Sequence, residues 1–589
     1  MRPGVLGPRA GLPPEAATPL AVIALLWGGL AIAGVLWLCG AAAGWMATRV
    51  WAPPPFSFDT AGAVVEVGAP QTFGASSVLL YGMWIAAGVG LSVAAGLWFA
   101  RGGMRPPADD PLQSMARPSD VATMTPKGAA ARARDLRPSL RSVAASGPDE
   151  FGVAVGELLP GGVLLRSSWE DVMLAIMAPR AGKTTSLAVP MVLSAPGPVI
   201  ATSNKADLVA ATEEIRARAG TCWVFDPQGI ARTPRKFTFN PLSFVREVTD
   251  ADRLAQHFVQ ELSDDAKGQD FWAKAAADLL GSLLMAAAVS GRDLAEVYKW
   301  LNDSASRIPV ELLRKHHQPQ LAAGLEGRQS GAVETREGIY ETARTAAQSL
   351  RDPRIMAWVT PDPSLPAFDP RTFAASADTV YAMSKDGGGS AAPLVAALVD
   401  SAQRAGQNTA EASAGRLDPP MVLVLDEAAN VAKIKDLPAL YSHLGSRGLM
   451  VATILQSYRQ GVRVWGEDGM GTLWSAATIK LIGAGIDDPK LAEDVSKLVG
   501  DHDVMVRSTT HGRDSSHQVS LRRQRILPPE AVRALPRGRA ILLVTGVRGA
   551  MLRLRPWYSG PRAGEITAAL KAAQGQITAR ARAEQEGVA

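Results

Sequence analysis

The sequence predicts an α/β fold: a doubly wound parallel sheet with an inserted all-α subdomain, preceded by two transmembrane helices. Three observations support this prediction. Short uncharged apolar runs alternate with helix-like segments from Val172 onward. Amphipathic helical patterns replace these runs between about residues 250 and 355. Two long uncharged apolar stretches, 20–46 and 76–100, precede all of this.

Length and composition indicate a globular protein with a membrane part. The chain has 589 residues, of which 47% are hydrophobic and 20% charged, which is unlike a disordered chain. Its net charge of +5 is compatible with anionic partners but does not require nucleic acid. With only Cys39 and Cys222, and no metal-type spacing among seven histidines, the sequence offers no disulfide framework or cysteine metal site.

The two apolar stretches each exceed the roughly 20 residues needed to cross a bilayer. We therefore predict a membrane anchor over 20–100, although a buried core hairpin is the alternative. The flanking arginines lie at positions 2, 9, 101 and 105. Because positive charge favours the cytoplasmic side, the segment 1–19 and the bulk of the chain are predicted to be cytoplasmic, in a multi-pass protein of the cell membrane.

Residues 101–149 are rich in Pro, Ala, Ser and Arg and contain no aromatic residue before the next segment begins. This composition is typical of a flexible linker with a basic end. We expect it to tether the following domain near anionic lipid headgroups, with contact to DNA as the alternative.

The stretch Asp171–Pro190 predicts a strand, a phosphate-binding loop and a helix. An apolar run ends in Gly182-Lys183-Thr184, the end of a Walker A pattern, in which backbone N–H groups at a helix N-terminus attract phosphate. Lys183 is expected to reach the β and γ phosphates of ATP, and the Thr184 hydroxyl to bind Mg²⁺. The predicted nucleotide-binding residues are Ala178, Pro179, Arg180, Ala181, Gly182, Lys183, Thr184 and Thr185.

Met177 departs from the full Walker A pattern, which has Gly at this position. A residue with a Cβ pays about 1–2 kcal/mol to adopt the left-handed backbone conformation. Met177 must therefore either avoid the left-handed conformation or be stabilised in it by its neighbours. The departure at Met177 leaves the rate of ATP hydrolysis open.

The second half of the nucleotide site is predicted at Met421–Ala429, where five apolar residues end in Asp426 and Glu427. This is a Walker B pattern, because ligands of open α/β sheets bind at the carboxyl ends of the strands. Asp426 is expected to hold Mg²⁺, and Glu427 to orient and deprotonate the attacking water.

Two further candidates flank the apolar run Leu449–Leu455. Gln456, directly after this run, either senses the γ-phosphate or simply ends the strand. Arg447, just before it, either stabilises transition-state charge on a neighbouring subunit's nucleotide or is a surface charge.

These patterns divide the chain into successive segments. Residues 150–250 form the first part of a nucleotide-binding domain, 251–365 an all-α insertion, and 366–560 the second part, in which a polar hairpin is expected over 501–525. The tail 561–589 is a marginal helix or disordered.

The order of several short motifs resembles one known family, the TraG/TraD-type coupling proteins of type IV secretion, which are conjugative ATPases of the FtsK/HerA superfamily. The motifs are MAPRAGKT at Met177–Thr184, SNKADL at Ser203–Leu208, VFDP at Val224–Pro227, FNPLS at Phe239–Ser243, DFW at Asp270–Trp272, LVLDEAANV at Leu423–Val431, ILQS at Ile454–Ser457 and ILPPEAVRALPRGRAIL at Ile526–Leu542.

This resemblance implies a RecA-like P-loop NTPase that uses ATP and Mg²⁺, forms a membrane-anchored homo-hexamer, and delivers DNA or protein to a secretion channel. Its implied partners are single- or double-stranded DNA, a relaxase or secreted protein, and the type IV channel components. The implied site is Lys183, Thr184, Asp426, Glu427 and Gln456. Alternatives are an FtsK-like DNA translocase or another secretion motor, and a weakly hydrolysing membrane adaptor that recruits substrate.

Overall fold

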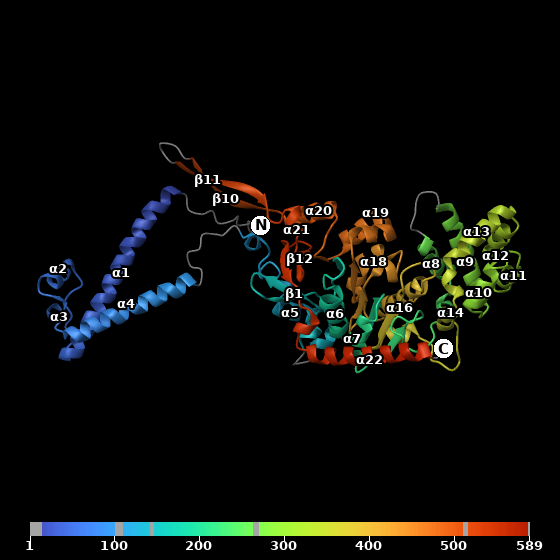
Figure 1. Cartoon of the computed structure of the whole chain (residues 1–589), viewed down its shortest axis with the longest axis horizontal. Helices are drawn as coiled ribbons and strands as arrows, with labels where there is room; N and C mark the ends of the chain where they lie inside the picture. The colour runs from blue at the N-terminus through green and yellow to red at the C-terminus, as the bar shows by residue number, and fades with distance from the viewer. Residues whose placement is uncertain (1–13, 101–109, 142–146, 263–269, 511–515, 587–589) are drawn as a thin grey trace. The chain divides into compact units, whose positions relative to one another are not determined.

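The computed structural model describes residues 14–100, 110–141, 147–262, 270–510 and 516–586 (Figure 1). The chain divides into two compact units, Met1–Asp109 and Asp110–Ala589. The four arginines on which the predicted orientation rests, and most of the predicted N-terminal segment 1–19, lie outside the described residues.

The first unit consists of helices. They are α1 (Pro14–Thr48), α2 (Phe58–Glu66), α3 (Ala69–Thr72) and α4 (Ser77–Ala100). The two long helices, α1 and α4, span the two predicted apolar stretches and contact each other. The indole of Trp84 on α4 donates a hydrogen bond of 3.0 Å to the carbonyl of Leu36 on α1, so the two helices are joined by a polar contact as well as by packing.

Among the described residues, two helical stretches are long and apolar enough to cross a membrane, Gly29–Thr48 and Phe271–Val289. The first lies in α1 near the N-terminus. The second is mostly buried inside the larger unit, which is the environment of a core helix. In α4 the described side chains up to Gly90 form a further apolar stretch, Ser77–Gly90.

The second unit is built on an eleven-stranded sheet with the order β2-β1-β13-β12-β9-β3-β8-β7-β4-β6-β5. The strands are β1 (Ala154–Leu159), β2 (Leu164–Arg166), β3 (Met173–Ile176), β4 (Val199–Ser203), β5 (Cys222–Phe225), β6 (Thr379–Met383), β7 (Met421–Leu425), β8 (Leu449–Leu455), β9 (Ile479–Gly483), β12 (Arg539–Val544) and β13 (Ala550–Arg553). The seven from β9 to β5 are parallel, as predicted. The other four add an antiparallel extension, which the prediction of a parallel sheet did not include.

The parallel strands are buried on both faces. In β3, Leu174 and Ile176 belong to one hydrophobic cluster, whereas Met173, Ala175 and the following Met177 belong to the other. Because successive side chains of a strand point to opposite faces, the strand is covered from both sides. This is why it reads in the sequence as an uninterrupted apolar run.

Helices of the second unit cover both faces of this sheet. Those before the helical insertion are α5 (Pro126–Leu136), α6 (Val189–Ser194), which continues the turn Thr184–Ala188, and α7 (Asp207–Arg216). Those after it are α15 (Pro370–Ala374), α16 (Ala392–Ala412), α17 (Ala428–Val431), α18 (Leu437–Leu444), α19 (Tyr458–Ala476), α20 (Pro489–Val499), α21 (Pro529–Arg533) and α22 (Ala563–Glu586). The expected P-loop NTPase fold class is confirmed.

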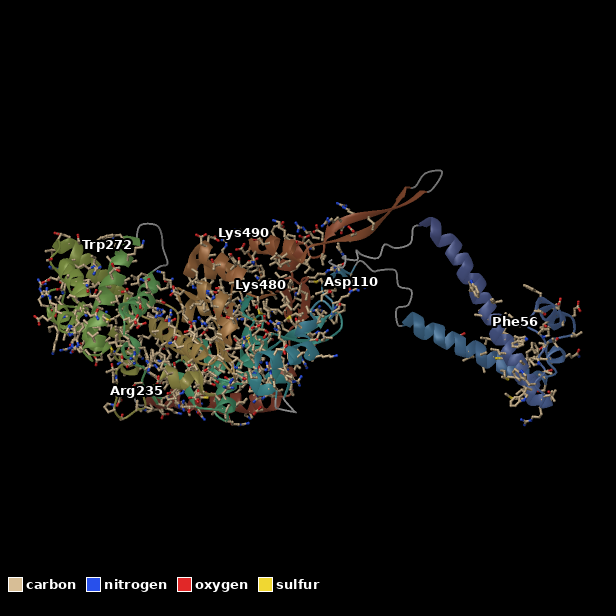
Figure 2. The ribbon with its side chains drawn as sticks, turned by 180° about the vertical axis from the view of Figure 1, so that it is seen from behind. Phe56, Asp110, Arg235, Trp272, Lys480 and Lys490 are labelled. Atoms are coloured by element: carbon tan, nitrogen blue, oxygen red, sulfur yellow. The ribbon has the colours of Figure 1, made fainter. Side chains whose placement is uncertain are left out.

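The segment between β5 and β6 contains the insertion, and its described secondary structure is helical apart from one isolated β-bridge between Thr238 and Ala367. The helices of the insertion are α8 (Val248–Val259), α9 (Asp270–Val289), α10 (Leu294–Leu301), α11 (Ile308–Lys315), α12 (Pro319–Gln329), α13 (Val333–Ala346) and α14 (Pro353–Val359). Figure 2 places Trp272 of α9 far from Lys480 of the central strand β9. The insertion therefore extends the unit sideways from the sheet.

The prediction of a flexible linker over 101–149 is wrong for residues 110–141, which fold onto the sheet unit. Helix α5 buries Ala129 and Ala133. The guanidinium of Arg137, buried itself, contacts Glu150 at 2.5 Å and Asp418 at 3.2 Å. The basic charge that suggested a solvated tether is thus partly neutralised inside the protein. Residues 101–109 and 142–146 lie outside the described part.

The C-terminal tail and the polar segment 501–525 both have regular secondary structure. The tail forms α22, which runs beside α7 (Figure 1) and buries Ile566 and Ala569. The polar segment expected as a hairpin forms the antiparallel pair β10 (Asp501–Thr510) and β11 (Ser516–Arg525), separate from the main sheet. The tail is therefore a helix, which was one of its two predicted alternatives, and the predicted hairpin is confirmed.

Candidate functional site

The candidate site lies where three adjacent parallel strands end. The central sheet places β8 between β3 and β7, and the register pairs Ile176 with Leu455 and Leu425 with Thr453. The phosphate loop follows β3, Gln456 follows β8, and Asp426 follows β7. Since parallel strands share one carboxyl edge, three segments far apart in the sequence meet there.

Met177 begins the phosphate loop without adopting the left-handed conformation, because its φ is not positive. Its N–H donates to the carbonyl of Leu455 at 3.0 Å, which extends the pairing of β3 with β8 by one residue. Its side chain is fully buried and fills the space beside Gly483, where an added Cβ would lie 2.5 Å from the Met177 Cγ. A glycine on the neighbouring strand therefore makes room for the residue that departs from the Walker A pattern.

The left-handed positions of the loop fall at two later residues, Arg180 with φ 63° and Gly182 with φ 93°. Glycine adopts this conformation without steric cost, whereas Arg180 pays about 1–2 kcal/mol. The loop then enters the turn Thr184–Ala188 and helix α6, so its backbone N–H groups lie at a helix N-terminus, the usual place for a bound phosphate. All eight predicted nucleotide-binding residues, 178–185, lie in this connection.

The Walker B aspartate lies next to the phosphate loop. The Thr184 hydroxyl donates to Asp426 Oδ2 at 3.2 Å. The other carboxylate oxygen, Oδ1, is buried and has no hydrogen-bond partner among the described protein atoms. A buried carboxylate oxygen without a partner is costly, and oxygen ligands of this kind suit Mg²⁺. Thr184 and Asp426 therefore fit the predicted metal.

The pKa of Asp426 also supports a metal site at this position. Burial, and next the adjacent Glu427, raise the pKa of Asp426 to about 6, while Lys183 and the hydrogen bond from Thr184 oppose this rise. The carboxylate is thus ionised at neutral pH but poorly solvated. A divalent cation at this position would supply the missing positive charge.

Glu427 is held between the phosphate loop and the tip of β8. Lys183 Nζ lies 3.2 Å from Glu427 Oε1, and both side chains are 8% exposed. Gln456 Nε2 donates to Glu427 Oε2 at 2.6 Å. The backbone of Glu427 is left-handed, with φ 55°, a strained conformation that is found at functional sites. The structure therefore brings together Lys183, Thr184, Asp426, Glu427 and Gln456.

Gln460 and Asn430 extend this constellation and were not predicted. The Gln460 side-chain oxygen accepts the N–H of Gln456 at 3.0 Å, and its amide donates to Asn430 Oδ1 at 3.0 Å. Gln456 and Gln460 are four residues apart at a helix start, a spacing that places them within reach of each other. Sequence spacing could have suggested this contact, but not the contact with Asn430, 30 residues away.

Arg447 does not join these residues. It precedes β8, whereas Gln456 follows it, so the seven residues of the strand separate them, about 20 Å at the rise of an extended chain. The Arg447 guanidinium pairs with Glu411 at 2.7 Å. Arg447 therefore cannot act on the nucleotide of its own chain, and its expected role toward a neighbouring subunit stays a prediction.

Comparisons with known proteins agree with this fold. Residues 420–537 match the family model described as the TraM recognition site of TraD and TraG. No curated protein matches the sequence. The structure is similar to the bacterial conjugative coupling protein TrwB lacking its first 70 residues, with a TM-score of 0.52 and 18% identity over 71% of this chain and 93% of that one.

Two further TrwB structures are similar. One, in complex with a non-hydrolysable GTP analogue, has a TM-score of 0.51 and 18% identity over 71% of this chain and 93% of that one. The other, in complex with ADP and Mg²⁺, has a TM-score of 0.50 and 17% identity over 72% of this chain and 94% of that one. The shared fold and the matched segment confirm the resemblance of this chain to the TraG/TraD-type coupling proteins.

Proposed function

We propose that this chain is a membrane-anchored coupling ATPase that drives DNA, or a protein substrate, to a type IV secretion channel. The observation that carries this proposal is the meeting of Lys183, Asp426, Glu427 and Gln456 at one edge of a TrwB-like sheet. These residues supply a cation for phosphate, a metal ligand, a base and a neutral donor, which is the set that ATP hydrolysis needs.

In this proposal the residues take distinct roles. Lys183 binds the β and γ phosphates of ATP, and Thr184 and Asp426 would hold Mg²⁺, which neutralises phosphate charge when bound. Glu427 orients the attacking water and accepts its proton. Gln456, which donates to Glu427 at 2.6 Å, aligns that carboxylate and is placed to respond to the γ-phosphate.

The remaining parts follow from the same proposal. The apolar helices α1 and α4 anchor the chain in the cell membrane as a multi-pass protein, with the larger unit in the cytoplasm. The helical insertion takes part in substrate recognition, and the matched segment 420–537 contacts a TraM-type protein partner or a relaxase complex. In a homo-hexamer, Arg447 acts on the nucleotide of the neighbouring subunit.

ATP turnover by the purified full chain, with and without single- and double-stranded DNA, tests this function. Lys183→Ala and Glu427→Gln are expected to lower turnover at least about 100-fold, because they remove a phosphate ligand and the general base. The matched controls are Lys299→Ala and Glu296→Gln on α10, which remove an exposed ion pair of the insertion and should leave turnover unchanged.

The alternatives give different results. Equal, negligible turnover in the wild type and both site variants would refute the motor and favour the membrane adaptor. A robust turnover that DNA does not change would favour protein export. The proposed topology is refuted if a reporter fused to the C-terminus is found outside the cytoplasm.

A further inference from the structure

A cavity of about 480 Å³ lies between α8, α15, α16 and the turn η6 (Pro241–Phe244). Its volume is in the range of about 300–1,000 Å³ that is usual for sites of small ligands. None of its lining residues belongs to the phosphate loop or to the Walker B pair. The nucleotide chemistry described above therefore leaves this cavity without a function.

The cavity carries an excess of positive charge. Four arginines line it, against only two aspartates. Arg253 pairs with Asp250 at 3.3 Å, and Arg404 pairs with Asp400 at 3.0 Å. The side chains of the other two, Arg246 and Arg371, are exposed and have no ion pair or hydrogen bond with the described residues. Two guanidinium groups are thus available to an anion.

His257 on α8 supplies a second, independent sign of a ligand. Its side chain is 4% exposed and lines the cavity, yet neither ring nitrogen has a hydrogen-bond partner among the described protein atoms. The nearest acidic atom, Asp400 Oδ2, lies 3.5 Å from Nε2, and Arg404 already donates to that carboxylate. Asp400 therefore gives Nε2 a long ionic contact, whereas Nδ1 has no partner among the described protein atoms. Buried polar groups are normally paired, so a ligand in the cavity could supply the partner of Nδ1.

The lining also offers an aromatic ring to a ligand. Phe244 is half-buried, lines the cavity, and is nearly parallel to Phe239, with 14° between the ring planes. Asn408 on α16, also part of the lining, is exposed and its amide has no hydrogen bond within the described structure. A planar ligand with its own donors and acceptors could lie against Phe244 and reach Asn408 and His257.

We propose that this cavity binds a nucleoside monophosphate, whose phosphate is held by Arg246 and Arg371 and whose base lies against Phe244. Arginine is well suited to phosphate, because its planar fork can donate two parallel hydrogen bonds. The ring of Phe244, together with His257 and Asn408, recognises the base. Helix α8 starts the helical insertion and α16 leads toward the Walker B strand, so the site lies between the insertion and the sheet.

Calorimetric titration of the full chain with AMP and with GMP tests the proposal. Neither probe carries the β and γ phosphates that Lys183 is expected to bind. Wild type and Lys183→Ala should both bind at least one probe, whereas the double variant Arg246→Gln/Arg371→Gln should bind it at least tenfold more weakly. Phe244→Leu should weaken binding about threefold or more.

The matched control is Arg354→Gln, which removes an arginine that is 82% exposed on α14 and does not line the cavity. It should bind the probe like the wild type. Arg371→Gln alone, at an exposed position, serves as a second test that does not depend on the folding of the double variant. Circular dichroism of each variant, together with ATP turnover of the variants other than Lys183→Ala, establishes that it is folded.

Three results would overturn the proposal. The wild type could show no saturable binding of either probe, or binding could be lost in Lys183→Ala but kept in the arginine variants. The wild type could also bind inorganic phosphate as tightly as the nucleoside monophosphates, which would remove the role of the base. Loss of oligomerisation by the arginine variants, with no probe bound by the wild type, would instead assign the cavity to contacts between copies of the chain.

Discussion

Gly483→Ala should disturb the phosphate loop from the neighbouring strand. A Cβ at position 483 would lie 2.5 Å from the Cγ, 2.7 Å from the Cε and 3.2 Å from the Cβ of Met177. The side chain cannot swing aside, because the closest atom is near its backbone and the site is fully buried. Overpacking of this kind costs about 1–3 kcal/mol. Because Met177 begins the loop, moving it displaces the groups that are expected to bind phosphate.

The expected result is weaker nucleotide binding. A cost of about 1–3 kcal/mol, if all of it appears in binding, corresponds to a loss of affinity of about 5-fold to about 140-fold. Titration with a fluorescent ATP analogue measures this loss. Met177→Ala removes the two closest atoms, Cγ and Cε, and keeps only the Cβ at 3.2 Å. Adding it to Gly483→Ala should therefore bring the affinity within about threefold of Met177→Ala alone.

A double-mutant cycle decides whether the two residues act together. The coupling energy between positions 177 and 483 should be about 1–3 kcal/mol. The reasoning is refuted if Gly483→Ala binds nucleotide like the wild type, or if the double variant loses the sum of the two single losses. Met177→Gly tests the motif itself: restoring the pattern's glycine should not improve binding, because Met177 does not need a left-handed backbone and its loss leaves a cavity.

Three further changes are predicted. Gln460→Ala should lower the maximal ATP turnover about tenfold with little change in KM, because Gln460 positions Gln456 and does not reach the phosphate loop; steady-state kinetics measure both. Cys222 should react slowly with iodoacetamide in a Cys39→Ser background, because burial raises the pKa of its thiol from 9.0 to about 12 and only the thiolate reacts. At pH 8 the expected rate is about a thousandfold lower in the folded protein than after denaturation. Arg137→Met should destabilise the docking of residues 110–141 by about 1–3 kcal/mol, seen as faster tryptic cleavage there, because it leaves two partly buried carboxylates without their cation.

The strands of the site could be predicted from the sequence for a physical reason. A parallel strand covered on both faces contains few polar residues, and Leu449–Leu455 and Met421–Leu425 accordingly read as unbroken apolar runs. Their ends are equally clear, because polar residues become possible where the strand leaves the core. Asp426, Glu427 and Gln456 were found at such ends, and the parallel order of the strands brings them together.

What the sequence did not reveal depends on contacts between distant segments. The space for Met177 comes from Gly483, about 300 residues away, and no local pattern connects the two. The docking of residues 110–141 depends on Asp418, also far along the chain, which accepts from both Arg137 and Ser139. Composition described this segment correctly as basic and proline-rich, but it carries no information on which acidic groups would neutralise it.

The hydrogen bonds around Glu427 connect the nucleotide site with the turn after β6, which lines a cavity together with residues of the helical insertion. From Gln456 they continue through Gln460 to Asn430, whose amide lies 3.5 Å from Asp386 Oδ2. Asp386 begins a Gly-Gly-Gly turn, and the cavity beside that turn is also lined by residues of the insertion, among them Gln348. The side chain of Gln456 bonds to Glu427 and its backbone N–H bonds to Gln460. A nucleotide-dependent shift that moves the backbone at the β8 tip would therefore reach Gln460 and Asn430, beside the segment expected to recognise substrate. The hydrogen bond of Gln456 to Glu427 is short, whereas the contact between Asn430 and Asp386 is long and therefore weak. Of the contacts in this series, the one between Asn430 and the glycine turn should break most easily.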